Sequence, residues 1–266
     1  MNRKDFILGG AALLGAGAYA SPVRSLIGGR VFDTVEKSMP TTQDYVQDGL
    51  LAMWDGIESE FNTSESSSEW VDLVSGISLL SRPSDTALFE KAEDHIHFPN
   101  GASAYCDIVG LASAMSNKTY TIEMVVRKEF VVRAYMLALA NRDEVSYGGS
   151  ASYLETGVNN VVGTNEVNAT PPSYGNIWQW SYGREGSRRT LFPNNKRNVI
   201  DQRSTTTAWS TNRLYLNTSQ VRESSSLSAR CKTDGNYYHL RVYSRYLDAE
   251  EAQHNYSIDK SRFNLP

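Results

Sequence analysis

The sequence predicts one all-β domain that ends in a short helix, and three observations carry this prediction. The chain has 266 residues, a length that suits one large all-β domain preceded by a leader. Short apolar runs alternate with period two and are separated by turn residues. Near the C-terminus, one such run is followed directly by a helix-capping pattern.

Residues 1–20 are typical of an export signal. Arg3 and Lys4 supply positive charge, residues 6–16 are apolar and rich in Gly and Ala, and residues 18–20 read Ala-Tyr-Ala, a cleavage-site pattern. The apolar run is shorter than the ~20 residues of a transmembrane helix, so we expect no stable membrane span in the mature chain. Lys4 stands where a twin-arginine leader has its second Arg, which leaves the export route open. We expect an exported protein of bacterial type, periplasmic, at the cell surface or extracellular.

The domain is expected over residues 45–266, after a linker or N-terminal arm at 21–44 that lacks clear periodicity. Residues 49–56 form its first apolar run and end in an Asp-Gly turn. The clearest strand covers residues 120–127, in which Tyr120, Ile122, Met124 and Val126 share one face. Further strands are expected at 70–76, 89–98, 131–140, 174–182 and 213–217, with 131–140 paired to 120–127.

The C-terminal part combines a strand with a capped helix. Tyr238, Leu240 and Val242 are expected on one face of the strand because side chains alternate. Asp248 can then cap a helix, and Glu251 three residues later completes a capping box.

These motifs resemble the laminin-G-like domains of the concanavalin A-like lectin/glucanase superfamily. Residues 49–54 read Gly-Leu-x-Ala-x-Trp, residues 70–73 read Trp-x-Asp-Leu, and residues 245–251 read Arg-x-Leu-x-x-Glu-Glu. The resemblance covers about residues 45–264. It implies an antiparallel two-sheet β-sandwich, the concanavalin A-like jelly roll, with a short C-terminal helix. It also implies a fold that mostly binds sugars, only sometimes cuts them, and commonly holds calcium.

The charge of the chain argues against a nucleic-acid partner. The formal net charge is -4 and no Lys/Arg run is long enough for a nucleic-acid footprint. Residues 184–203 are locally basic, which fits either a solvated loop or an anion-binding patch for acidic sugars.

No catalytic set emerges from the sequence. Retaining glucanases of this superfamily alternate acidic residues along one strand, whereas Glu123 stands alone on its strand. The Gly-x-Ser-x-Gly, His-Glu-x-x-His and Cys-x-x-Cys motifs are absent. We therefore expect a non-catalytic protein, with Glu123 as the one candidate acid of a divergent glycoside hydrolase.

Metal and thiol chemistry stay open. His95 and His97 share a face near Asp94, as a hydrogen-bonded pair or as metal ligands. Cys106 and Cys231 form a disulfide or remain two buried thiols. Four aspartates occur at strand ends, where they either form turns or bind a calcium ion: Asp55, Asp72, Asp94 and Asp234.

The candidate ligand site is a row of residues along one strand. Its aromatic rings can stack on sugar rings while amide and guanidinium groups bind hydroxyl groups. The other interpretation places the row in the core between two sheets, and a bulge can split it between both faces. The row consists of Tyr174, Asn176, Trp178, Trp180 and Tyr182, followed by Arg184.

The leading hypothesis is an exported, non-catalytic carbohydrate-binding, lectin-like domain whose partner is a glycan. The alternative is a structural or protein-interaction module, of the surface adhesin, phage-tail or surface-layer type, that binds a surface protein through loops 143–173 and 184–206. A divergent glycoside hydrolase is the third hypothesis.

Overall fold

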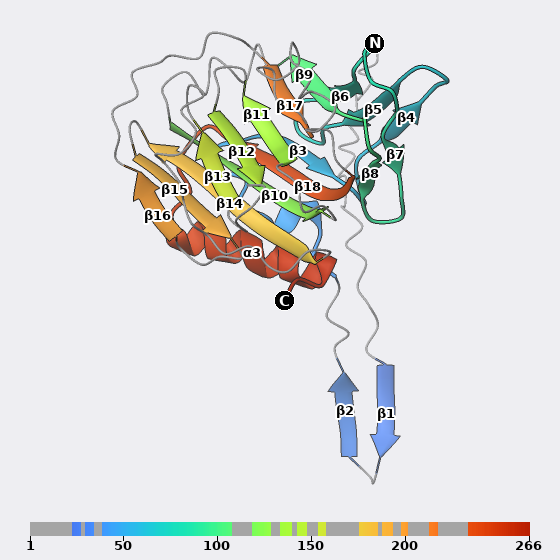
Figure 1. Cartoon of the computed structure of the whole chain (residues 1–266). Helices are drawn as coiled ribbons and strands as arrows, with labels where there is room; N and C mark the ends of the chain where they lie inside the picture. The colour runs from blue at the N-terminus through green and yellow to red at the C-terminus, as the bar shows by residue number, and fades with distance from the viewer. Residues whose placement is uncertain are drawn as a thin grey trace, which may run out of the picture. The chain divides into compact units, whose positions relative to one another are not determined.

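The chain forms two units, residues 1–39 and 40–266. The computed structural model describes residues 23–27, 30–34, 39–107, 119–128, 134–139, 143–147, 154–157, 176–185, 188–193, 198–201, 213–217 and 234–266. In the first unit, β1 (Val23–Ile27) and β2 (Arg30–Thr34) pair as an antiparallel hairpin (Figure 1). This hairpin falls within the segment that was expected to be a linker or arm.

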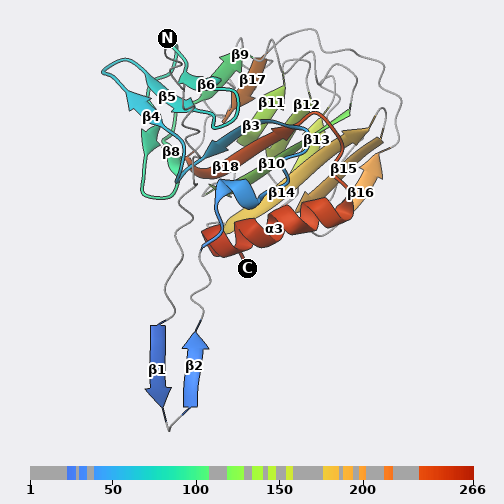
Figure 2. The same ribbon diagram turned by 180° about the vertical axis from the view of Figure 1, so that it is seen from behind.

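The second unit is an antiparallel two-sheet β-sandwich with one C-terminal helix, as predicted (Figures 1 and 2). The first sheet runs in the order β16-β15-β14-β10-β18-β8-β7, and β3 also pairs with β18. Its strands are β3 (Leu50–Asp55), β7 (Glu90–Lys91), β8 (Ile96–Phe98), β10 (Thr119–Lys128), β14 (Ile177–Glu185), β15 (Arg188–Pro193), β16 (Asn198–Asp201) and β18 (Gly235–Tyr243).

The second sheet runs in the order β13-β12-β11-β17-β9-β6-β5-β4. Its strands are β4 (Phe61–Thr63), β5 (Ser68–Val71), β6 (Ser78–Ser81), β9 (Ala104–Asp107), β11 (Ala134–Leu139), β12 (Asp143–Tyr147), β13 (Leu154–Gly157) and β17 (Arg213–Leu216). A 3-10 turn, η1 (Thr42–Asp44), precedes β3.

The core lies between the two sheets. The predicted inner face of β10 is confirmed, because Tyr120, Ile122, Met124 and Val126 are all fully buried in one cluster. The second sheet contributes apolar side chains such as Trp70 to the same cluster. Burial of this alternating face is the main force that holds the sandwich together.

One predicted strand pairing is wrong. Residues 131–140 contain β11, but β11 pairs with β12 and β17 in the second sheet. The neighbours of β10 are β14 and β18. Alternation along a strand indicates which side chains face the core, but it does not indicate which strand lies alongside.

The face of Tyr238 also differs from the prediction. The register between β10 and β18 shifts where Val125 and Val126 lie opposite His239 and Tyr237. This bulge interrupts the alternation, so Tyr237, Leu240 and Val242 face the core. Tyr238 instead packs on the outer face with Phe263.

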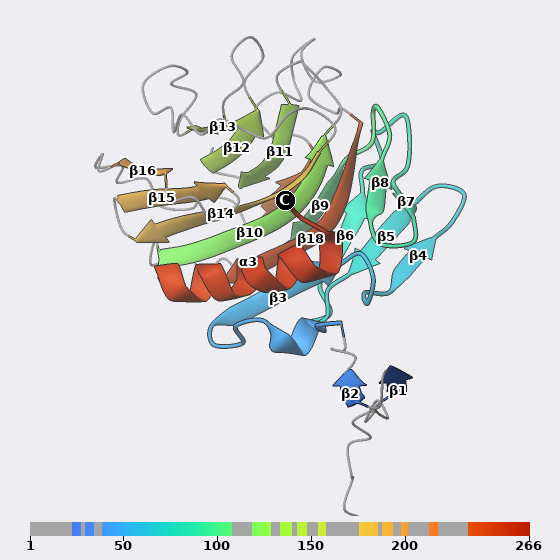
Figure 3. The same cartoon turned by 90° about the horizontal axis from the view of Figure 1, so that it is seen from below.

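Helix α3 (Ala249–Phe263) covers the outer face of the first sheet, over β10, β18 and β3 (Figure 3). The predicted cap is confirmed: the Asp248 carboxylate accepts hydrogen bonds from the backbone N–H groups of Glu250 and Glu251, and Glu251 completes the capping box. The buried face of α3 is half polar: Asn255, Asp259 and Arg262 lie among the apolar residues Ala252, Ile258 and Phe263. Among the described residues, no helix combines the length and the hydropathy that a membrane span requires.

Candidate functional site

Most of the predicted aromatic row lies in the core. Trp178, Trp180 and Tyr182 are only 4%, 0% and 3% exposed, and Arg184 is buried as well. The interpretation of this row as an exposed stacking surface is therefore wrong for these residues. The physical reason is that β14 lies inside the first sheet, between β10 and β15, with this face turned toward the second sheet. Tyr174 lies outside the described residues.

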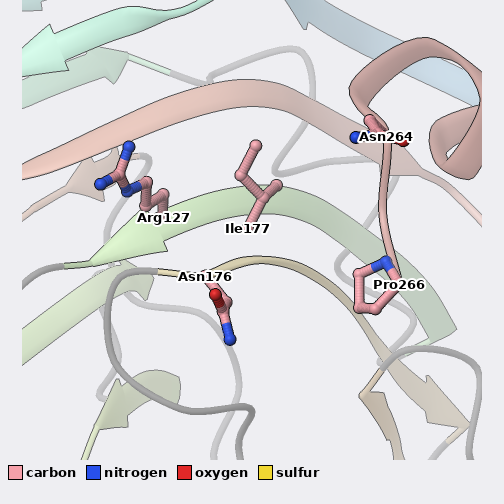
Figure 4. A pocket seen from close by; sticks show the side chains of 5 residues that line it. All are labelled: Arg127, Asn176, Ile177, Asn264 and Pro266. Atoms are coloured by element: carbon pink, nitrogen blue, oxygen red, sulfur yellow. The ribbon is translucent and has the colours of Figure 1, made fainter.

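Among the described members of the row, Asn176 is the exposed one, and it lines a pocket at the start of β14. The pocket has a volume of about 420 Å³. The described residues that line it are shown in Figure 4: Arg127, Asn176, Ile177, Asn264 and Pro266.

Strand register and a helix cap build this pocket. Arg127 lies near the end of β10 and is directly opposite Ile177 of β14. On the other side, Asn264 ends α3 in the left-handed conformation, with φ of 52°, and turns the chain toward the strands. The Tyr256 hydroxyl donates a hydrogen bond of 2.8 Å to the carbonyl of Pro266, which holds the segment after the helix in place.

A row of side chains continues from the pocket across the outer face of the first sheet. Arg127 lies opposite Asn236 of β18, and Asn236 lies opposite His97 of β8. Because directly opposed residues of antiparallel strands share a face, these side chains are neighbours. We call Ile177, Arg127, Asn236 and His97 the outer-face row.

A hydrogen bond connects two members of this row. His97 Nδ1 lies 2.9 Å from Asn236 Oδ1. Since an amide oxygen only accepts, Nδ1 of His97 is the donor. Asn236 and Arg127 lie near the Tyr238 hydroxyl and act to lower its pKa. The pKa of Tyr238 is raised, chiefly by burial and further by the charge of Asp94, so the hydroxyl stays protonated and neutral at ordinary pH.

The pocket rests on an apolar cluster. Val125, Tyr238, Phe263 and Leu265 are buried together, and Ile177 packs against them. The site therefore joins a fixed apolar base to a polar rim, the combination found in most small-molecule sites.

Glu123, the candidate acid, is not part of the pocket. It is fully buried beneath α3, where it accepts hydrogen bonds from Arg241 Nε at 2.9 Å and Asn255 Nδ2 at 2.8 Å. Burial, followed by the neighbouring Asp259, raises its pKa, while Arg241 acts in the opposite direction. A carboxyl group that no solvent reaches cannot protonate a bound sugar, so Glu123 has a structural role here.

The remaining candidate residues have structural partners. His95 Nδ1 lies 2.7 Å from Asp94 Oδ1. Asp55 accepts hydrogen bonds from the backbone N–H groups of Ile57 and Glu58, and Asp72 caps the turn after β5 in the same way. In the described part of the chain, no three His, Cys, Asp or Glu side chains are grouped so that they could hold a metal.

The structure describes one of the two cysteines, so both a disulfide and a pair of buried thiols remain predictions. Cys106 is buried in β9, and Cys231 lies outside the described residues. Of the loops proposed for protein interaction, 143–173 and 184–206, large parts also lie outside them.

No protein-family model matches this chain, and no curated protein matches it in sequence. Several solved structures share its fold. A mutant of Trypanosoma rangeli sialidase with trans-sialidase activity has a TM-score of 0.59 and 11% identity, over 80% of this chain and 33% of the sialidase chain. Trypanosoma rangeli sialidase in complex with sialic acid has a TM-score of 0.56 and 10% identity, over 91% of this chain and 36% of that one.

Botulinum neurotoxin type C, whose cell entry depends on interaction with two ganglioside molecules, has a TM-score of 0.56 and 8% identity. That likeness covers 79% of this chain and 51% of the toxin chain. These neighbours are lectin-like β-sandwiches. The chain spans about a third of the sialidase chains and about half of the toxin chain, and at such low identity the likeness shows the fold alone.

Arg127, Asn236 and Asn264 were not among the site residues predicted from the sequence. The signal for Arg127 was present, because residues 121, 123, 125 and 127 form the second face of the best-predicted strand. That face carries Thr, Glu, Val and Arg, and its polar end marks where the helix no longer covers the sheet.

Proposed function

We propose that this domain binds carbohydrate at the pocket beside Asn176, without catalysis, in an exported protein. The observation that carries the proposal is the composition of the pocket. The Arg127 guanidinium and the amides of Asn176 and Asn264 can bind sugar hydroxyl groups, while Ile177 and Pro266 offer apolar contact.

The fold neighbours support the ligand class. A sialidase in complex with sialic acid and a toxin that interacts with gangliosides each contain a sandwich of this type over part of their chains. The buried position of Glu123 supports a binding role over hydrolysis, because the one acid nominated from the sequence lies beneath α3. Export is proposed from the leader at residues 1–20.

The test is a glycan array probed with the purified protein, followed by titration of each hit. Asn176→Trp should abolish binding because the larger side chain fills the pocket, and Asn176→Ala should weaken binding about two- to tenfold through loss of one neutral hydrogen bond. Asn62→Ala is the matched control, since Asn62 is an exposed Asn on β4 of the second sheet. A folded protein that binds no glycan, or whose binding survives Asn176→Trp, would refute the site.

A further inference from the structure

The pocket and the outer-face row carry charge unevenly. Among the described residues that line the pocket, Arg127 is the one with a charged side chain. The acidic groups lie at the other end of the row: Asp234 Oδ2 is 3.8 Å from His97 Nε2, and Glu90 lies opposite His97 in the register of β7 and β8. The charged side chains described along the row therefore differ in sign, with a cation at the pocket and acidic groups beside β8.

We propose that this site selects glycans that bear an anionic group, with Arg127 binding the anion and Asn236 and His97 binding the next sugar. This inference rests on the proposed function and specifies its ligand class. A guanidinium presents its N–H donors in a planar fork that matches the two oxygens of a carboxylate or a sulfate.

Arg127 lies beside a packed part of the sheet. It is directly opposite Ile177 and Asn236 in the strand register, and Ile177 packs against the buried cluster of Val125, Tyr238, Phe263 and Leu265. Asn236 is in turn held by the hydrogen bond from His97. Neighbours that are already ordered before the ligand arrives lose less side-chain entropy when it binds, which favours affinity.

The row is long enough for more than one sugar ring. Neighbouring strands are about 4.8 Å apart, so the two steps from β10 through β18 to β8 span roughly 10 Å. At the far end, the Asp234 carboxylate is suited to accept hydrogen bonds from sugar hydroxyl groups and would repel a second anion. The anionic group of the ligand should therefore lie at the pocket end.

The experiment uses two matched pairs of probes with the full-length protein. Trigalacturonic acid is compared with its methyl ester, and 3′-sulfated lactose with lactose, so that each pair differs only in the anionic group and the two pairs separate carboxylate from sulfate. Wild-type protein should bind at least one anionic probe about ten- to a hundredfold more tightly than its neutral partner. Its affinity for that probe should fall between 50 and 500 mM salt, while binding of the neutral probe should not change.

Variants then test which residues cause the preference for the anionic probe. Arg127→Gln should abolish the discrimination within the pair, and Arg127→Lys should retain only part of it because the fork is lost. Asn236→Ala should weaken the binding of trigalacturonic acid more than that of monomeric galacturonic acid. Asn62→Ala should change neither affinity. The salt series needs no variant, so it decides the matter even if Arg127→Gln does not fold.

The outcomes separate the two proposals. Equal binding of the charged and neutral members, or discrimination that survives Arg127→Gln in a folded protein, would overturn the anionic preference while leaving carbohydrate binding at the pocket intact. Binding of no probe and no arrayed glycan by a folded protein would overturn both.

Discussion

Arg241 and Asp259 meet beneath helix α3, where Nη2 of the arginine lies 2.6 Å from Oδ2 of the aspartate and both side chains are fully buried. The same guanidinium donates to Glu123 through Nε, and its Cζ lies 4.0 Å from the centre of the Tyr45 ring. One buried cation is thus shared by two carboxylates and an aromatic face. This arrangement explains how a helix whose inner face is half polar can stay on the sheet, because the ion pairs satisfy polar groups whose burial would otherwise be unfavourable.

Asp259→Ala should therefore lower the free energy of unfolding by about 3 to 5 kcal/mol, since it leaves part of the Arg241 charge buried without its bidentate partner. Denaturant unfolding of wild type and variant measures this difference. Lys260→Ala is the matched control on the same helix, and because Lys260 is exposed it should change stability by no more than about 0.5 kcal/mol. Similar small changes in both variants would contradict a structural role for the pair.

Acid should destabilise the domain in two stages. Burial, followed by the charge of Arg241, lowers the pKa of His239 below its ordinary value, so the unfolded chain binds that proton first. Burial acts to raise the pKa of Asp55, but the hydrogen bond from His239 and the charges of His239 and Arg262 outweigh it and hold this pKa below the ordinary value.

The direction in which pH changes stability follows from each of these two pKa shifts. A histidine whose pKa is lowered on folding reduces stability as pH falls below about 6.5, the pKa of histidine in an unfolded chain. The Asp55 contribution is present above about pH 4 and is lost as pH falls further.

Melting temperatures between pH 8 and pH 3 should therefore fall first below pH 6.5 and again below pH 4. His239→Gln should flatten the first decline, whereas His254→Gln, at an exposed position of α3, should leave it unchanged. If the melting temperature of His239→Gln still fell below pH 6.5 as it does in wild type, another group would be responsible for the first decline.

Trp180 should affect folding and not ligand selectivity. Because its side chain is fully buried between the sheets, Trp180→Ala should lower stability by about 3 to 5 kcal/mol. Asn176→Ala, at the exposed start of the same strand, should stay within about 0.5 kcal/mol of wild type. Thermal unfolding compares the two, and a stable, well-folded Trp180→Ala protein with selectively lost glycan binding would restore the aromatic row as the site.

The contrast between Trp180 and Asn176 shows which features of the fold could be predicted from the sequence and which could not. Alternation correctly predicted the buried face of β10, and the spacing of Asp248 and Glu251 correctly predicted the start of α3. Both are local patterns, in which neighbouring residues carry the whole signal. The sequence could not decide between core and surface for the residues of β14, because strong aromatic alternation is typical of both.

The outer-face row could not be predicted because it depends on pairing between distant segments. His97, Arg127 and Asn236 come from three strands, and Arg127 and Asn236 are separated in sequence by most of the second half of the domain. The bulge beside Tyr238 adds a second difficulty, since it changes the face of that side chain without any Gly or Pro to mark it. Long-range register is a property of the folded sheet, and only the structure reveals it.

Asn264 offers a way to separate binding from stability. It ends α3 with φ of 52° and also lines the pocket. Glycine adopts this left-handed conformation without penalty, so Asn264→Gly should keep stability within about 0.5 kcal/mol while removing one amide from the pocket. Glycan affinity should then fall about two- to tenfold, the effect of one neutral hydrogen bond.

Asn264→Ala provides the comparison, because it removes the same amide but places a Cβ in the left-handed conformation at a cost of about 1 to 2 kcal/mol. Calorimetric titration and thermal unfolding of both variants measure affinity and stability side by side. Equal loss of affinity with unequal loss of stability would assign the amide to ligand binding. If affinity instead followed stability, with Asn264→Gly binding like wild type, the amide would serve only the end of the helix, and the pocket would have to recognise its ligand through Arg127 and Asn176.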